Sequence, residues 1–240
     1  MTAALQIDHV SHNFGAVQAL DDVSLTVPRG GFTALLGVNG AGKTTLFSLV
    51  TRLYNNRSGM IRVAGHDLRR EPSQALARLG VVFQSRAMDA DLTIRQNLIY
   101  HASLHGIPGR LARPCIDQVL GQVDLADKAD TRVTALSGGQ SRRAEIARAL
   151  IHSPDLLLLD EATVGLDVKS RAEVLALTRR LIARDGVSAL WATHIMDEID
   201  PADDLVILHR GRVLRQGRAA DIAGPHGLTR AFLDLTGVAP

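Results

Sequence analysis

A glycine-rich segment near the start of the chain has the residue types and spacing needed to hold a polyphosphate. It fits the pattern G-x-x-x-x-G-K-[ST] with Gly37, Val38, Asn39, Gly40, Ala41, Gly42, Lys43 and Thr44. Its backbone N–H groups and the amino end of a following helix would face bound phosphates. Lys43 would then bridge the β- and γ-phosphates, and Thr44 would hold Mg²⁺. The alternative, a glycine-rich turn with a surface lysine, is less consistent with the strand and helix expected on either side, so we predict a nucleoside triphosphate site.

An acid pair follows the most apolar run of the chain, residues 156–159. Asp160 and Glu161 come directly after this run, and a parallel strand ends near the ligand edge of an α/β fold. Asp160 suits Mg²⁺, and Glu161 could polarise a water molecule for attack on the γ-phosphate. Buried strands also often end in an acid that caps the next helix. Taken alone, the pair supports both interpretations equally.

A second segment of small residues precedes an expected helix, at residues 136–140. It reads L-S-G-G-Q and contains Ser137, Gly138, Gly139 and Gln140. A helix amino end behind open, small residues offers another phosphate site. On helix chemistry alone, an N-cap by Ser137 with two flexible glycines is the better interpretation.

The remaining pattern supplies the elements that position these groups. We expect strands at residues 5–10, 23–27, 32–36, 60–63, 80–83, 156–159 and 187–193, with a hairpin around Arg210 and Gly211. We expect helices at residues 46–53, 93–105, 111–123, 142–151, 170–183 and 228–235. The sequence therefore predicts an α/β fold: a P-loop NTPase core with a mixed sheet, an antiparallel β lobe and an inserted helical lobe at about residues 85–140. The whole chain, residues 1–240, is expected to form one domain.

Composition excludes several classes of protein. The 27 Lys and Arg residues nearly balance the 25 Asp and Glu residues, so nucleic acid is not expected as the main partner. Cys115 is the only cysteine, which rules out an internal disulfide. The first residues lack the apolar stretch of a secretory signal, and no apolar run is long enough to span a membrane. Membrane contact would have to come through a partner.

Taken together, the motifs resemble those of the nucleotide-binding subunits of ATP-binding cassette (ABC) transporters, whose signature is L-S-G-G-Q. The resemblance runs from Leu5 to about Gly217 and keeps the family's motif order. It implies that Phe14 stacks on adenine, that Gln84 senses Mg²⁺ and the attacking water, and that His194 contacts the γ-phosphate. Thr45 joins the phosphate-binding set. Without the resemblance, Phe14 would be a core residue, Gln84 a solvated one and His194 a structural one.

The same resemblance implies how the protein works. The segment Gly165, Leu166 and Asp167 matches the family's loop between two ATPase copies. ATP would be held in a homodimer, or in a heterodimer with a related ATPase, with each signature over the other copy's nucleotide. Hydrolysis would release the copies, and the helical lobe would pass this change to transmembrane permease subunits. The protein would lie peripherally on the cytoplasmic face of the membrane.

Some residues depart from the family pattern, and two other functions compete. Val38 and Ala162 stand where proline is frequent, and Val164 where serine is frequent, but none of these changes removes a group that contacts phosphate or metal, so activity is expected to survive. One rival is a soluble ABC-type ATPase acting on nucleic acid or ribosomes, which usually has two cassettes or a long coiled-coil insertion. The other is a pseudo-ATPase, which the presence of both acids and His194 argues against.

Transport direction and cargo are less well defined by the sequence. The chain stops soon after the hairpin, without the C-terminal regulatory domain of some importers, and this favours export. Residues 45–49 and 96–101 resemble those of the export-like branch associated with alcohol catabolism dependent on pyrroloquinoline quinone (PQQ). The cargo itself is not encoded here, because selectivity lies in the permease.

Overall fold

The computed structural model describes residues 3–237, so residues 1, 2 and 238–240 of the predicted domain lie outside the described range. Its centre is a six-stranded sheet made of β3 (Phe32–Leu36), β6 (Leu79–Val82), β7 (Leu156–Asp160), β8 (Ser188–Thr193), β9 (Asp204–His209) and β10 (Arg212–Arg218). The strand order is β10-β9-β3-β8-β7-β6. All neighbours are parallel except β9 and β10, which form the predicted antiparallel hairpin. The prediction of a mixed sheet is confirmed.

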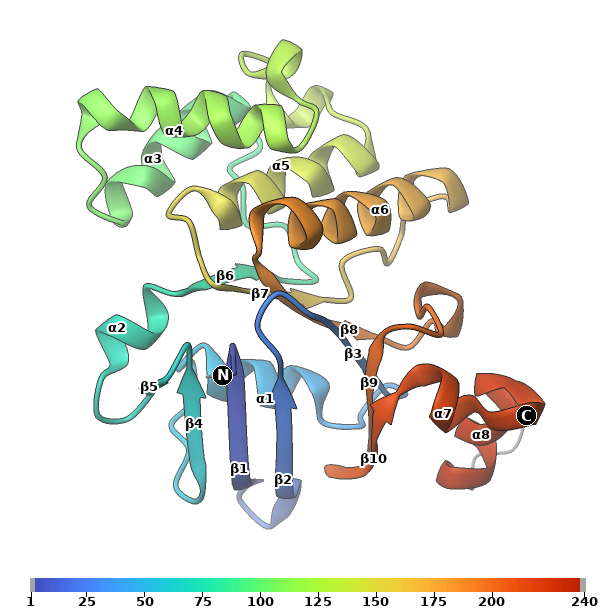
Figure 1. Cartoon of the computed structure of the whole chain (residues 1–240). Helices are drawn as coiled ribbons and strands as arrows, with labels where there is room; N and C mark the ends of the chain where they lie inside the picture. Colours follow the sequence, from blue (N-terminus) through green and yellow to red (C-terminus); the bar gives the residue numbers. More distant parts are fainter. Residues whose placement is uncertain (1–2, 238–240) are drawn as a thin grey trace.

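Helices cover both faces of this sheet (Figure 1), with α5 (Gly138–Leu150) and α6 (Val168–Asp185) on one side and α1 (Lys43–Val50) on the other. Alternate residues of a strand point to opposite faces. In β7, Leu157 and Leu159 therefore pack with α5 and α6, whereas Leu156 and Leu158 pack with α1. This burial on both faces explains why the sequence of β7 is an uninterrupted run of leucines.

A four-stranded antiparallel sheet forms the predicted β lobe. It consists of β1 (Leu5–Phe14), β2 (Val17–Val27), β4 (Met60–Val63) and β5 (His66–Asp67), in the order β2-β1-β4-β5. Leu5 pairs with Val27 on one side and with Val63 on the other. The inner strand β1 ends at Phe14, which is one of the predicted nucleotide-binding residues.

One predicted helix is too long. Apolar spacing extends the helix after the phosphate loop to Leu53, but α1 ends at Val50. Thr51 is the C-cap, and Arg52 adopts a positive φ of 57°, a conformation that cannot continue a right-handed helix. Leu53 is consequently exposed, at 64% of its surface.

The inserted lobe consists of α3 (Ile94–Leu104), α4 (Gly109–Gln122) and the short 3-10 helices η1 (Ala126–Lys128) and η2 (Val133–Ala135). Figure 1 shows α3 and α4 stacked beyond α5, on the far side from the sheet. Their buried residues Ile94, Leu98 and Ile116 share one continuous core with Ile146 of α5. The lobe is therefore packed onto the signature helix and has no separate core of its own.

The remaining elements are short. Helix α2 (Pro72–Leu76), which the sequence pattern does not predict, precedes β6, and η3 (Met196–Glu198) follows β8. The chain closes with α7 (Ala219–Ala223), η4 (Gly224–His226) and α8 (Gly227–Thr236). Within residues 3–237, none of the helices has the length and apolar character needed to cross a membrane.

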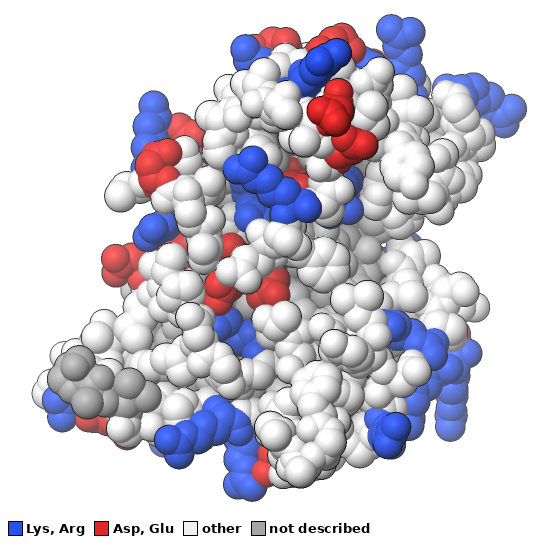
Figure 2. Space-filling view, turned by 180° about the vertical axis from the view of Figure 1, so that it is seen from behind, with Lys and Arg blue, Asp and Glu red and all other residues white. Residues whose placement is uncertain are grey.

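The surface charges are mixed. On the face seen in Figure 2, Lys and Arg side chains are interspersed with Asp and Glu, with no broad area of a single sign. A protein that binds nucleic acid mainly through phosphates needs a concentrated basic surface. This view agrees with the near-neutral net charge of the sequence.

Candidate nucleotide site

The glycine-rich segment forms a tight loop between β3 and α1. The Gly37 N–H donates to the Thr193 carbonyl at 3.2 Å, and the Ala41 N–H donates to the Val38 carbonyl at 3.1 Å. A Cβ at Gly37 would lie 2.6 Å from the Leu208 carbonyl oxygen. Gly42, the N-cap of α1, has a φ of 111°, which only glycine adopts without strain. These glycines are therefore required by the close packing of the loop on the sheet.

Lys43 is buried at the base of this loop, with only 5% of its side chain exposed. Its Nζ donates to the carbonyl oxygens of Gly37 at 2.7 Å and Val38 at 3.3 Å. It also lies 3.2 Å from Oε1 of Glu161, the second acid after β7. Lys43 of the loop and Glu161, which follows a strand distant in sequence, are thus in direct contact.

Glu161 is the centre of this arrangement. His194 Nδ1 lies 3.2 Å from its Oε1, and Gln84 Nε2 lies 3.3 Å from its Oε2. Its backbone has a φ of 48°, unusual for a residue with a side chain, and such strain is concentrated at functional sites. Three predicted catalytic residues, from the ends of β6, β7 and β8, are therefore brought into contact.

Asp160 has the environment expected of a metal ligand. Its Oδ1 is buried and has no hydrogen-bond partner among the described residues. Burial raises the pKa of Asp160, as does the adjacent charge of Glu161, whereas Lys43 and a hydrogen bond from Thr44 lower it. An uncompensated carboxylate oxygen beside a threonine hydroxyl is a donor set that suits Mg²⁺, a hard cation that prefers oxygen. The residues present fit the predicted ion.

A cleft of about 640 Å³ lies in front of these groups. Among the predicted residues it is lined by Phe14, Asn39, Gly40, Ala41, Gly42, Lys43, Thr44, Thr45, Gln84 and Glu161. Phe14 is 45% exposed, so it is not a core residue, and its ring makes an edge contact with Tyr54 at a centroid distance of 5.4 Å. An exposed aromatic face at the rim of a cleft is suited to stacking on a base.

Five lining residues were not predicted from the sequence: Val17, Gln18, Ala19, Arg210 and Gly211. Gly211, in the β9–β10 turn, donates to the Ala41 carbonyl at 2.9 Å, and its own carbonyl accepts from the Asp21 N–H at 2.8 Å. The hairpin thus joins the phosphate loop to β2. The sequence does predict a turn at Arg210 and Gly211, but spacing alone does not show that this turn meets a loop about 170 positions earlier.

The signature residues lie apart from this cleft: none of residues 137–140 is among the described residues that line it. Ser137 is the N-cap of α5, where its hydroxyl accepts from Gln140 N–H at 3.2 Å while the Gln140 side chain accepts from Ser137 N–H at 3.0 Å. Gly139 packs on α6, because a Cβ there would lie 2.9 Å from Ser170 Oγ. The capping interpretation is confirmed, and it leaves a second exposed helix amino end on the chain.

Asp167, predicted to lie in the loop between ATPase copies, caps α6. Its Oδ1 accepts from Ser170 N–H at 2.9 Å, and its Oδ2 accepts from Ser170 Oγ at 2.8 Å. Because Ser170 also touches Gly139, this loop and the signature are neighbours in the same chain.

Three charged residues of α5 hold the segment that carries Gln84, and sequence patterns did not single them out. Arg142 donates to the carbonyls of Phe83 at 2.8 Å and Gln84 at 3.2 Å. Glu145 accepts from the N–H groups of residues 87 and 88 at 2.7 and 2.9 Å. Arg148 donates to the Val81 carbonyl at 2.8 Å and pairs with Glu145 at 3.0 Å. Their i, i+3, i+6 spacing places the three charges on one face of α5 but does not by itself distinguish this role from a solvated face.

A buried glutamate links the segments that carry Glu161 and His194. Glu198, only 2% exposed, accepts hydrogen bonds from Trp191 Nε1 at 2.9 Å, Thr193 Oγ1 at 2.6 Å and Thr163 Oγ1. Thr193 directly precedes His194, and Thr163 follows Glu161 by two residues. The position of both predicted catalytic groups therefore depends on one carboxylate.

A phosphate loop joined to a buried acid on the same sheet, at the mouth of a cleft, defines the protein as a P-loop nucleoside triphosphatase. The family model described as ABC transporter matches residues 20–164. The chain belongs to the ABC transporter family and is an ATP-binding, ATP-hydrolysing subunit of the kind that works with transmembrane permease components.

Individual relatives agree with this assignment. The daunorubicin resistance ATP-binding protein DrrA3 of Streptomyces coeruleorubidus is 38% identical, across 98% of this chain and 79% of that protein. The Nod factor export ATP-binding protein I of Paraburkholderia xenovorans is 37% identical, across 94% of this chain and 72% of that protein. Among solved structures, cbiO1 from Clostridium perfringens, part of the ABC transporter complex cbiONQ, superposes with a TM-score of 0.86 at 26% identity, covering 97% of this chain and 95% of that one.

Proposed function

We propose that this subunit hydrolyses ATP with Glu161 as general base and thereby drives export of a substrate through separate permease subunits. The observation that carries the proposal is the position of Glu161, within 3.3 Å of Lys43, His194 and Gln84 at the mouth of the cleft. A general base must lie beside the groups that hold the phosphate and the attacking water. Loss of the carboxylate charge should then stop hydrolysis without removing the phosphate contacts.

The remaining roles follow from the contacts. The loop residues Gly37, Asn39, Gly40, Ala41, Gly42, Lys43, Thr44 and Thr45 would bind the phosphates, and Phe14 the adenine. Thr44, Gln84 and Asp160 would hold Mg²⁺, which when bound neutralises charge on the phosphates. His194 would contact the γ-phosphate and orient it toward Glu161. The entire chain would act as one domain, residues 1–240, with the lobe of residues 85–140 as its contact to the permease.

We further infer that the working unit is a dimer, either of two copies or with a related ATPase. Ser137, Gly138, Gly139 and Gln140 form a helix amino end outside the chain's own cleft, and such an end binds anions. A two-fold arrangement would bring this end over the partner's ATP. The dimer would be attached to the permease at the cytoplasmic face of the membrane.

The proposed direction is supported by the relatives whose names refer to drug resistance and to Nod factor export. Within that export-like group, residues 45–49 and 96–101 favour the branch associated with PQQ-dependent alcohol catabolism. Deleting the gene should then impair growth on an alcohol as the carbon source but not on glucose, and equal growth on both would contradict this assignment.

The direct test is Glu161→Gln, which keeps the size of the side chain but removes the base. We expect ATP affinity by calorimetry to be preserved and kcat to fall about 10²- to 10⁴-fold, the usual contribution of a general base. Gel filtration with Mg-ATP should show a dimer that persists. Glu173→Gln on the exposed side of α6 is the matched control and should hydrolyse ATP normally. A Glu161→Gln variant that turns over like the control would remove Glu161 from the mechanism.

A further inference from the structure

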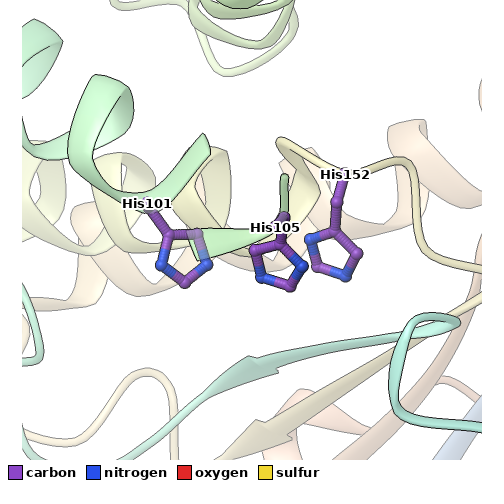
Figure 3. A group of neighbouring side chains, drawn as sticks. All are labelled: His101, His105 and His152. Carbon is purple, nitrogen blue, oxygen red and sulfur yellow. The ribbon is translucent and has the colours of Figure 1, made fainter. Parts of the chain in front are cut away.

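Three histidines outside the nucleotide site lie together where the helical lobe meets α5 (Figure 3). His101 is in the last turn of α3, His105 is the C-cap of that helix, and His152 lies just after the C-cap of α5. Candidate ligand nitrogens of the three rings all lie within 4.8 Å of one another. The proposed ATPase mechanism uses none of them.

The spacing of the nitrogens is within reach of what a shared metal ion requires, although the lone pairs of the stacked rings do not yet converge. Two nitrogens bound to one tetrahedral Zn²⁺ at 2.0–2.1 Å are about 3.4 Å apart, so the rings must close by roughly 1.4 Å at most. The rings of His105 and His152 are stacked at a centroid distance of 3.8 Å, only 4° from parallel. His105 is exposed, so it can rotate about its side-chain bonds until its lone pair converges with the others. Figure 3 shows the three rings side by side in one row.

His152 already has the hydrogen bond that metal-binding histidines use. Its Nε2 lies 3.1 Å from the Leu79 carbonyl, which can only accept, so Nε2 carries the proton. Its Nδ1 must then present a lone pair, and this atom is buried without a hydrogen-bond partner in the part of the chain that the structure describes. A ring fixed by a backbone carbonyl, with the other nitrogen free, is the usual arrangement around a bound metal.

The electrostatic setting also accommodates a cation. The cluster lies at the carboxyl ends of α3 and α5, where helix dipoles favour positive charge. Arg148 opposes this, but its charge is offset by Glu145 at 3.0 Å and by the Val81 carbonyl at 2.8 Å.

We propose that His101, His105 and His152 form a binding site for a divalent transition-metal ion of the imidazole-preferring kind, such as Zn²⁺. Three imidazoles leave a fourth position, which faces solvent on the side of His105 and would be filled by water. Because His101 and His105 belong to α3 whereas His152 is held by Leu79 of β6, the ion would tie the helical lobe to the central sheet.

The test is a titration of the purified full-length chain with ZnCl₂ at pH 7.5, without nucleotide or Mg²⁺, followed by calorimetry. We expect one tight site per chain, and a Co²⁺ complex with the strong visible absorption of low-coordinate cobalt. His105→Gln should lower the affinity at least tenfold and abolish the cobalt spectrum, because it removes one of three ligands. His105 is exposed, so this variant should keep its circular dichroism and its ATPase activity.

Two controls locate the site. His226→Gln removes an exposed histidine away from the cluster and should bind Zn²⁺ like wild type. His194→Gln removes the histidine beside Glu161, and the tight zinc site should persist in this variant too. The proposal is overturned if wild type binds less than one Zn²⁺ per chain, if His105→Gln binds as tightly as wild type, or if binding disappears in His194→Gln alone.

Discussion

The buried carboxylate of Glu198 gives a prediction whose magnitude can be worked from its contacts. It accepts from the Trp191 indole and from the hydroxyls of Thr163 and Thr193. In Glu198→Gln, the amide oxygen can still accept the hydrogen bond from Trp191 Nε1. The new NH₂ group can donate to a threonine hydroxyl, which rotates so that its oxygen accepts. The three bonds survive but are no longer charge-assisted.

A hydrogen bond to a charged group contributes about 1.5–3 kcal/mol and a neutral one about 1 kcal/mol, so over three bonds Glu198→Gln should lose about 1.5–6 kcal/mol of unfolding free energy. Glu198→Ala should lose more, because the Trp191 N–H can only donate and would be left buried without an acceptor. The order of the two variants, Ala worse than Gln, distinguishes a hydrogen-bonding role from simple filling of space.

Urea unfolding followed by fluorescence of Trp191, the only tryptophan, would measure these losses. Glu173→Gln is the matched control. Glu173 is 46% exposed and its nearest charged partner, Lys169, lies at 4.0 Å. Such surface pairs contribute about 0–1 kcal/mol. Because Thr163 and Thr193 flank the two predicted catalytic residues, kcat should also fall in Glu198→Gln while ATP affinity is kept. If Glu198→Gln matched Glu173→Gln in both stability and kcat, the reasoning from these contacts would be refuted.

Three other substitutions test the site. Lys43→Ala should abolish ATP binding measured by calorimetry, and unchanged affinity would refute the phosphate-loop assignment. Ser137→Ala should cost about 1 kcal/mol of stability, because it removes the N-cap of α5. Thr93→Ala removes the same kind of N-cap from α3 and should cost about as much. Only Ser137→Ala should reduce ATPase activity. Gly37→Ala should weaken ATP binding, because its Cβ would meet the Leu208 carbonyl at 2.6 Å, whereas Gly109→Ala, with open space around it, should not.

Local chemistry made much of the site predictable. The glycines of the loop are required by backbone angles and close approaches, so the loop is recognisable in the sequence. The leucine run of β7 is required by burial on both faces of the sheet, so this strand is recognisable too. Glu161 was a candidate because it follows a buried strand, and parallel strands of one sheet bring their carboxyl ends together. Gln84 and His194 were predicted only from the resemblance to the ABC family.

The parts that were missed depend on contacts between distant segments. Nothing near Arg142 or Glu145 in the sequence shows that these charges hold residues 83–88, and an amphipathic pattern treats them as a solvated face. Likewise Glu198 looks like a surface acid of a short helix until the strand that carries Trp191 is placed beside it. The predicted end of α1 was wrong because the positive φ at Arg52, which ends the helix, leaves no mark on the apolar spacing.

Helix α5 has a mechanical consequence for signalling inside the protein. It is 13 residues long, about 20 Å at 1.5 Å per residue, and is built as one uninterrupted rod. Its amino end carries the signature residues, and Arg142 on its side donates hydrogen bonds to the backbone carbonyls of Phe83 and Gln84. In the proposed dimer, a displacement of this amino end by the neighbouring ATPase copy would therefore also move the segment around Gln84, beside the chain's own Glu161. The two active sites would then be coupled through α5.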